Sequence, residues 1–466
     1  MKATIIIGAL LALVSLSALA ENPRDMKFPA IQFDSPEPER WVTDNGIVVF
    51  FLEDHQLPVV IAQAFIRGGD IYEPADLTGL SEITATLLRS GGAGNRTPDQ
   101  VDADLDFVGA NIYSSSSPDA LSMSVRSLKK DFDPIFRIFS DILIDPRFDS
   151  AKVDMEISNK KDRILRQNDD PGSVARRIYY ETIYKNHPYG KNATLESVNK
   201  ISRNDIINYH KQFYSPDNCI LAVSGDLTSK ELKELLNKYL AGWQKSGQKP
   251  VPPPMAEMQY QPGVYYAFKD INQAHIRFGH LSMDTKNPDR YAMEIMNFAL
   301  GSGGFSSRLA KQVRTTAGLA YGVGSYDYQR PLMGTFFGYC LTRADAMGQA
   351  AQMMIDIIND VRQNGINTDE MELARDAIIN SYVFNYDTPA RIVTAKANLE
   401  YFGFPLDQMK KDIEGYKAVK LEDCNRVAKK YLDLSKDAII FVGNKELFDK
   451  PLDTFGPVTE INLETK

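Results

Sequence analysis

The spacing of apolar residues divides this chain of 466 residues into short strands and longer amphipathic helices. Apolar runs and alternating segments predict strands at residues 46–52, 59–67 and 120–126. Apolar residues three and four positions apart predict helices at residues 79–88, 98–107, 131–143, 150–167 and 172–184. A sheet covered by several helices is the natural packing of such elements, and it predicts an α+β fold.

One layout of helix, turn and strand occurs twice along the chain. Residues 209–226 and 427–444 each end a helix on an aromatic residue, turn through polar residues and run an apolar strand into a glycine. The two glycines are Gly225 and Gly443, which sets a sequence offset of 218 between the copies. Repetition at a fixed offset is typical of a duplicated unit.

Two further matches follow in the same order. Pro171 and Pro389 each end an Asp-x-Pro tripeptide between helical patterns, and they repeat at the same offset of 218. Leu-x-Ser-Gly-Gly segments at residues 88–92 and 300–304 repeat at an offset of 212, a difference that an ordinary loop insertion explains. We therefore expect two similar domains from internal duplication, each a mixed β-sheet covered by helices.

The expected domain boundaries follow from a proline-rich stretch in the middle of the chain. Five of the residues in 246–262 are proline, which excludes a helix or a central strand and favours a semi-rigid linker. We expect an N-terminal domain at residues 21–245 and a C-terminal domain at residues 263–466.

Residues 1–20 are typical of a secretory signal peptide. Lys2 precedes an apolar run at residues 5–14, and Ala18-Leu19-Ala20 supplies the small residues that a signal peptidase accepts. An N-terminal membrane anchor is the alternative, although the run is short for a bilayer span. We expect export to the periplasm or the medium, and no membrane span in the mature chain.

The charge and the cysteine content of the chain argue against certain kinds of partner and site. The chain has 53 Lys and Arg against 61 Asp and Glu, a net charge of −8, which argues against binding to a nucleic-acid backbone. Its three cysteines, Cys219, Cys340 and Cys424, are widely spaced, so they predict buried free thiols rather than a disulfide framework or a zinc cluster.

Several motifs together resemble the M16 metallopeptidases, the family of pitrilysin, insulinase and the mitochondrial processing peptidase. They are the duplicated halves, the proline-rich hinge, the Asp-x-Pro before a helix that leads to His187-Pro188-Tyr189-Gly190, and the segment GGFSSRL at 303–309 followed by Arg314 and GLAY at 318–321. The resemblance covers about residues 40–450. It implies two α+β domains per chain and two chains that close around a peptide chamber, as in the short bacterial two-subunit members.

The family's zinc motif, His-x-x-Glu-His on a helix, is not intact in this chain. Its first ligand position holds Glu82, the general-base position Ala85 and the second ligand position Thr86. The third ligand, a glutamate in the family, falls near Arg163. Alanine cannot accept a proton, threonine is a poor zinc ligand and a guanidinium repels the ion, so we expect no metal in this chain.

The histidines support this expectation without any alignment. The chain has five, at positions 55, 187, 210, 275 and 280, and no two are four residues apart. The closest pair, five apart on a predicted strand, would point to opposite faces of a sheet. Zinc bound at a displaced site by an autonomous hydrolase stays open as a third alternative.

Arg314 and Tyr321 match the Arg and Tyr that, in the family, reach from a C-terminal domain toward the substrate near the zinc. An arginine fork can bind a substrate carbonyl or carboxylate, and a tyrosine hydroxyl can donate to a developing oxyanion. The alternative is structural: Arg314 complements a helix dipole before Gly318, and Tyr321 is a strand aromatic.

The family also binds substrate backbone on a strand at a sheet edge. The matching stretch here is residues 109–117, which includes Asn111, Ser114 and Ser115. Small serines would leave such an edge open to a peptide by β-augmentation. A polar loop or a solvated edge is the alternative.

These observations lead to one hypothesis and one alternative. We expect an exported subunit of M16 type that binds no zinc and pairs as a heterodimer with a zinc-bearing M16 subunit. In that pair it would supply Arg314 and Tyr321 for binding a peptide substrate. The alternative is a non-enzymatic protein of M16 fold that binds peptides or serves as a scaffold, and an isolated chain could also form a homodimer.

Overall fold

The computed structural model describes residues 35–247 and 249–463, and the expected signal peptide lies outside this range. The strands form two sheets of six. The first sheet contains β1 (Glu39–Val42), β2 (Val48–Glu53), β3 (Val59–Ile66), β4 (Asn111–Ser116), β5 (Leu121–Leu128) and β6 (Cys219–Gly225). The second contains β7 (Gly263–Phe268), β8 (Gln273–Leu281), β9 (Ala320–Tyr328), β10 (Thr335–Arg343), β11 (Ala438–Gly443) and β12 (Val458–Ile461).

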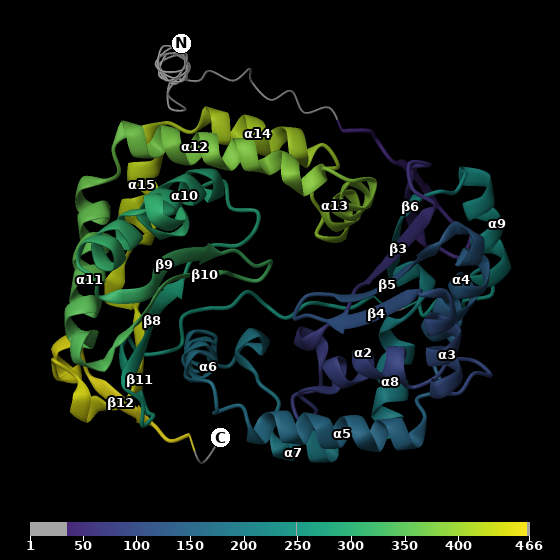
Figure 1. Ribbon diagram of the computed structural model, residues 1–466, viewed down its shortest axis with the longest axis horizontal. Helices are drawn as coiled ribbons and strands as arrows, with labels where there is room; N and C mark the ends of the chain where they lie inside the picture. Colours follow the sequence, from purple (N-terminus) through teal and green to yellow (C-terminus); the bar gives the residue numbers. More distant parts are fainter. Residues whose placement is uncertain (1–34, 248, 464–466) are drawn as a thin grey trace, which may run out of the picture. The chain divides into compact units, whose positions relative to one another are not determined.

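The helices occupy the segments between the strands (Figure 1). Those before the linker are α2 (Leu80–Ser90), α3 (Pro98–Val108), α4 (Lys129–Ile144), α5 (Ser150–Leu165), α6 (Pro171–Ile183), α7 (Leu195–Lys200), α8 (Arg203–Phe213) and α9 (Ser229–Tyr239). Those after it are α10 (Arg290–Asn297), α11 (Met347–Asn364), α12 (Thr368–Tyr382), α13 (Pro389–Tyr401), α14 (Gln408–Ala418) and α15 (Leu421–Tyr431). The α+β fold with two similar halves is confirmed.

Five strands of each sheet share one topology, as the duplication predicts. Their strand orders are β1-β2-β6-β3-β5-β4 and β12-β7-β11-β8-β10-β9. In each sheet one parallel pair, β2 with β6 or β7 with β11, adjoins three antiparallel strands. The outermost strands differ, because β1 pairs antiparallel to β2 whereas β12 pairs parallel to β7.

The repeated Asp-x-Pro tripeptide marks the start of a helix in each half. Asp170 caps α6 by accepting the N–H of Ser173, and Thr388 caps α13 by accepting the N–H of Arg391. The proline that follows each cap, Pro171 or Pro389, fills the first helical position, where no backbone donor is needed.

These two helices cross over between the halves. Helix α6 packs on β8 and β11 of the second sheet, and α13 packs on β6, β2 and β3 of the first (Figure 1). Each sheet is therefore covered by its own helices on one face and by one helix of the other half on the second face. This burial on both faces explains the continuous apolar run from Cys219 to Val223.

The contact of α6 with the second sheet depends on Gly279 of β8. A Cβ atom there would lie 2.0 Å from the carbonyl oxygen of Phe336 and 2.8 Å from the hydroxyl of Tyr179. The Tyr179 hydroxyl donates to that same carbonyl at 3.0 Å. Glycine thus makes room for a buried hydrogen bond between α6 and β10.

We expect Gly279→Ala to lower the free energy of unfolding by at least about 2 kcal/mol, because a β-carbon would separate packed backbone and displace Tyr179. Urea unfolding followed by circular dichroism measures the change. Gly242→Ala is the matched control, since a Cβ atom there meets nothing within 4 Å. Equal stability of both variants would contradict this account.

Candidate functional site

Helix α2 carries the positions of the degenerate motif, and a glutamate outside the helix caps it. Its N-cap, Gly79, has a left-handed φ of 105° and no side chain to accept a backbone donor. The Glu73 carboxylate accepts instead, from the N–H of Gly79 at 3.0 Å and from the N–H of Ser81 at 2.6 Å.

The three motif positions lie within one turn of α2. The hydroxyl of Thr86 donates to the carbonyl of Glu82 at 3.0 Å, which leaves it facing its own helix. Ala85 is buried and has no polar atom. The side chain of Glu82 is about half-exposed and faces α5.

Two cations of α5 surround Glu82. The ammonium of Lys160 forms an ion pair with one carboxylate oxygen, and Arg163 Nη2 lies 3.6 Å from the other. Arg163 also binds the buried carboxylate of Glu156 at 2.6 Å. Helical spacing places positions 156, 160 and 163 on one face of α5.

These side chains do not fit a zinc ion. A tetrahedral site needs three or four neutral imidazole, thiolate or carboxylate ligands, whereas here the carboxylates are neutralised by an ammonium and a guanidinium. Within residues 35–247 and 249–463, no three His, Cys, Asp or Glu side chains come together in a way that could hold a metal ion.

The proposed peptide platform is strand β4. It is the outermost strand of the first sheet and pairs with β5. Asn111 is exposed, Ser114 is buried, and the hydroxyl of Ser115 lies 2.9 Å from that of Ser122. Of these three side chains only that of Asn111 is exposed, and the backbone groups of alternate residues of β4 face the open edge of the sheet.

Arg314 and Tyr321 lie together on the surface of the second half. Arg314 is in the last turn of the π-helical segment Ala310–Thr316, and Tyr321 is at the start of β9, the outermost strand of its sheet. The guanidinium carbon is 6.0 Å from the centre of the Tyr321 ring and 4.7 Å from that of Phe305. Tyr321 is 79% exposed and Phe305 is 68% exposed.

In this exposed cluster of Phe305, Arg314 and Tyr321, the guanidinium of Arg314 is not neutralised by an acid. No carboxylate of the described residues lies within ion-pair distance of Arg314. Two aromatic rings hold the guanidinium by cation–π contacts, which restrict its rotamers without neutralising it. The arrangement leaves the arginine fork and the tyrosine hydroxyl available to a ligand.

The structure gathers the sequence-predicted residues into separate groups. Glu82, Thr86 and Arg163 lie between α2 and α5, and Arg314 and Tyr321 lie at the edge of the second sheet. No hydrogen bond, ion pair or ring contact joins the two groups in the part of the chain that the structure describes.

Sequence reasoning missed Lys160, Glu156, Glu73 and Phe305. The first two could have been found from the spacing of four and seven residues between position 156 and positions 160 and 163. Nothing in the local pattern identifies Glu73 as a cap, because it lies outside the usual capping positions. Phe305 lies within the quoted GGFSSRL segment, and only the folded chain shows its contact with Arg314.

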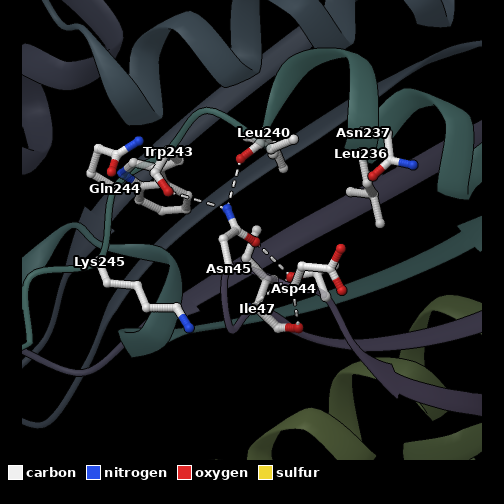
Figure 2. Close-up of a pocket in the computed structure, with 11 residues that line it drawn as sticks. Asp44, Asn45, Ile47, Leu236, Asn237, Leu240, Trp243, Gln244 and Lys245 are labelled. Carbon is white, nitrogen blue, oxygen red and sulfur yellow. Dashed lines mark hydrogen bonds between the residues drawn. The ribbon is translucent and has the colours of Figure 1, made fainter.

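The first half also has a cavity whose central amide group is already hydrogen-bonded within the chain. It has a volume of about 500 Å³ and lies between the β1–β2 turn and the end of α9 (Figure 2). Its amide, Asn45 Nδ2, donates to the carbonyl oxygens of Leu240 at 2.7 Å and Trp243 at 3.2 Å. These bonds satisfy carbonyls beyond the end of α9, so the amide is not available to a ligand.

Comparison with known families decides the identity of the fold. The family model for "Insulinase (Peptidase family M16)" matches residues 48–195. The family model for "Peptidase M16 inactive domain" matches residues 200–378. The chain belongs to the M16 peptidase family. The resemblance expected from the GGFSSRL and GLAY segments is thereby confirmed.

Some relatives of this M16 chain are named as zinc proteases, and one is named as a non-peptidase homolog. "Non-peptidase homolog YmxG" of Helicobacter pylori is 22% identical over 412 residues, which cover 87% of this chain and 94% of the relative. "Uncharacterized zinc protease YmxG" of Bacillus subtilis is 20% identical over 395 residues, which cover 84% and 95%.

Solved structures share the fold. A peptidase M16 inactive domain from Pseudomonas fluorescens superposes with a TM-score of 0.81 and 22% identity, covering 90% of this chain and all of that chain. The periplasmic protease PqqL of Escherichia coli gives a TM-score of 0.75 with 15% identity, covering 94% of this chain and 50% of that chain.

The unusual cap of α2 gives a testable dependence on pH. Burial, followed by the neighbouring Asp70, raises the pKa of Glu73 from 4.5 to about 8. Because the folded chain holds this proton more tightly, Glu73 contributes stability that is fully present below pH 4.5 and is lost as pH rises through 8. Glu73→Gln, which keeps one acceptor oxygen, should flatten this decline.

Urea unfolding of both proteins between pH 5 and 8.5 measures the two slopes. Glu196→Gln, at an exposed carboxylate paired with Lys200, is the control and should leave the slope of the wild type in place. Parallel curves for wild type and Glu73→Gln would show that Glu73 is ionised throughout this range.

Proposed function

We propose that this M16 chain is an exported subunit that binds no zinc and completes the peptide site of a zinc-bearing M16 subunit. The observation that carries the proposal is the exposed cluster of Phe305, Arg314 and Tyr321, which keeps a charged fork and a hydroxyl free while the motif on α2 is filled by cations. The chain retains groups for binding substrate and lacks those for activating water.

Each group has a defined task in this proposal. The Arg314 guanidinium binds a carbonyl or carboxylate of the peptide, and its two aromatic neighbours fix its direction. The Tyr321 hydroxyl donates to the oxygen that becomes negative as the peptide bond is attacked. Backbone groups on the open side of β4 pair with the extended peptide, with Asn111 beside them.

The metal and the general base belong to the partner. Zinc held by an intact His-x-x-Glu-His helix would activate water there, and this chain would contribute orientation and charge. Export is supported by the signal-like N-terminus and by the periplasmic location of the structural relative PqqL. None of the helices in the described residues is long and apolar enough to cross a membrane.

A peptide-binding or scaffolding protein without enzymatic activity is the second candidate. It is favoured by the ion pairs that occupy the α2 motif and by the name of the Helicobacter relative, a non-peptidase homolog. Both candidates use the same exposed residues, so binding alone does not separate them.

Reconstitution separates them. Purified alone, the chain should carry no stoichiometric zinc by elemental analysis and should cleave no fluorogenic peptide. Mixed with a zinc-bearing M16 chain from the same organism, it should elute as a heterodimer and give peptidase activity that neither chain has alone. A heterodimer that forms without any gain in activity would favour the scaffold, and zinc-dependent cleavage by the isolated chain would overturn both.

A further inference from the structure

Two further arginines without an ion-pair partner among the described residues lie where α6 covers the second sheet. A cavity of about 340 Å³ opens between the first turns of α6 and strands β8, β9 and β10. Its lining includes Arg176, His275, Arg277, Tyr326, Phe337 and Tyr339. Three of these six side chains are basic and three are aromatic, and none is acidic.

Arg277 is the less exposed of the two arginines that line this cavity. Its guanidinium carbon lies 3.8 Å from the centre of the Phe337 ring and 5.1 Å from that of Tyr179. Its Nε atom is buried and has no hydrogen-bond partner among the described residues. No carboxylate in the described ranges lies within ion-pair distance of it, so a partly desolvated cation is left with an unused donor.

Two further groups face the same space. Arg176 of α6 is exposed and donates from Nη2 to the hydroxyl of Ser173 at 3.2 Å. His275 of β8 is partly buried, and burial lowers its pKa, so it is a neutral hydrogen-bonding group at neutral pH. Asp170 is the carboxylate that influences both, but it is already the cap of α6, accepting the N–H of Ser173 at 2.6 Å.

The first sheet and α13 contain the positions equivalent to Arg277 and Arg176, and there the two side chains bind each other. Ala62 faces Val223 in the first sheet as Ile276 faces Phe441 in the second, and Val223 and Phe441 are related by the sequence offset of 218. The position equivalent to Arg277 is therefore Gln63. The same offset makes Thr394 of α13 the equivalent of Arg176.

Gln63 and Thr394 satisfy each other. The Thr394 hydroxyl donates to Gln63 Oε1 at 3.3 Å. The second half has replaced this neutral pair with two arginines that repel each other and share no acid. Such an arrangement costs stability unless an anion joins it, which indicates a binding role.

From these observations we infer that the cavity is a binding pocket for a peptide carboxylate. The Arg277 and Arg176 guanidiniums hold the carboxylate oxygens, His275 adds a hydrogen bond, and the rings of Phe337, Tyr326 and Tyr339 contact the apolar part of the same residue. The inference rests on the proposed function in taking the ligand to be a peptide. The carboxylate comes from a C-terminus or from an acidic side chain.

Three small probes test the pocket on the full chain by saturation-transfer NMR and titration. N-acetyl-phenylalanine carries a terminal carboxylate, N-acetyl-phenylalaninamide carries none, and N-acetyl-isoglutamine carries a side-chain carboxylate. We expect the amide to bind at least about tenfold more weakly than either acid. The stronger of the two acids identifies the source of the carboxylate.

Two variants tie the binding to these residues. Arg277→Gln, which copies the residue of the first half, and Arg176→Gln, at an exposed position, should each weaken binding of the acids by about tenfold or more. Arg343→Gln is the control, because that arginine of β10 is already paired with Asp345 at 3.0 Å. It should leave binding unchanged.

Equal binding of the acid and the amide, or unchanged binding in both Gln variants, would overturn the inference. The outcome is separate from reconstitution, because these probes need no partner subunit. Restored peptidase activity without binding of the probes would reject the pocket alone. Binding of the probes without restored activity would reject the proposed role in peptide hydrolysis and leave the pocket in place.

Discussion

Tyr321→Phe should lower the kcat of the reconstituted heterodimer by about 10²- to 10³-fold and leave KM nearly unchanged. The substitution keeps the ring 6.0 Å from Arg314 and removes the hydroxyl that would donate to the oxyanion. One such donor typically contributes about 2.7–4 kcal/mol to the transition state and little to the ground state. Steady-state cleavage of a fluorogenic peptide measures both constants.

Tyr328→Phe is the matched control for this variant. Tyr328 lies on the same strand and is 50% exposed, and its ring contacts Arg330, a contact that phenylalanine preserves. Arg314→Ala should act differently, raising KM because it removes a group that binds the substrate before the reaction. Full activity after both Tyr321→Phe and Arg314→Ala would show that neither side chain contributes to the peptide site of the heterodimer.

The expected strands and helices agree with the structure to within a few residues, because local periodicity decides them. The helix expected at residues 150–167 is α5, Ser150–Leu165, and the strand expected at residues 59–67 is β3, Val59–Ile66. The nearly constant sequence offset between the halves predicts the duplication, and the corresponding order of five strands in each sheet agrees with it. All three cysteines are free and buried, as expected.

The crossed packing of α6 and α13 could not be predicted in the same way. An amphipathic pattern shows that a helix has an apolar face, but it does not say which sheet that face covers. Gly279 and Tyr179, which fix the position of α6, lie in different halves of the sequence. Contacts of this range depend on the folded chain as a whole. The expected boundaries at residues 21, 245 and 263 stay a prediction.

The sequence predicts that the three motif positions share one helix, but it does not show which side chains surround them. The motif positions follow from the spacing along one helix, so Glu82, Ala85 and Thr86 lie where the pattern places them. The partner of Glu82 comes from α5, 78 residues farther along the chain. The spacing from position 156 places Lys160 and Arg163 on one face of α5, but nothing in the sequence shows that this face meets α2.

Lys160 is central to rebuilding a metal site in this chain. We expect the variant Glu82→His, Ala85→Glu, Thr86→His, Arg163→Glu to bind zinc poorly and the same variant with Lys160→Met to retain about one zinc per chain. The Lys160 side chain is 12% exposed and points at residue 82, so after loss of Glu82 its ammonium is left at the position the ion must take. At short range in a partly buried site, two like charges repel by several kcal/mol.

Elemental analysis after dialysis against a weak chelator, together with competition titration, measures this difference. We expect the affinity for zinc to be at least about tenfold higher without Lys160. A version of the five-residue variant that keeps Ala85 is the control: it should bind zinc equally well and cleave no peptide, because it has no base. Equal affinity with and without Lys160 would mean that the ammonium moves into solvent, and that the missing imidazoles alone explain why the wild-type motif does not fit zinc.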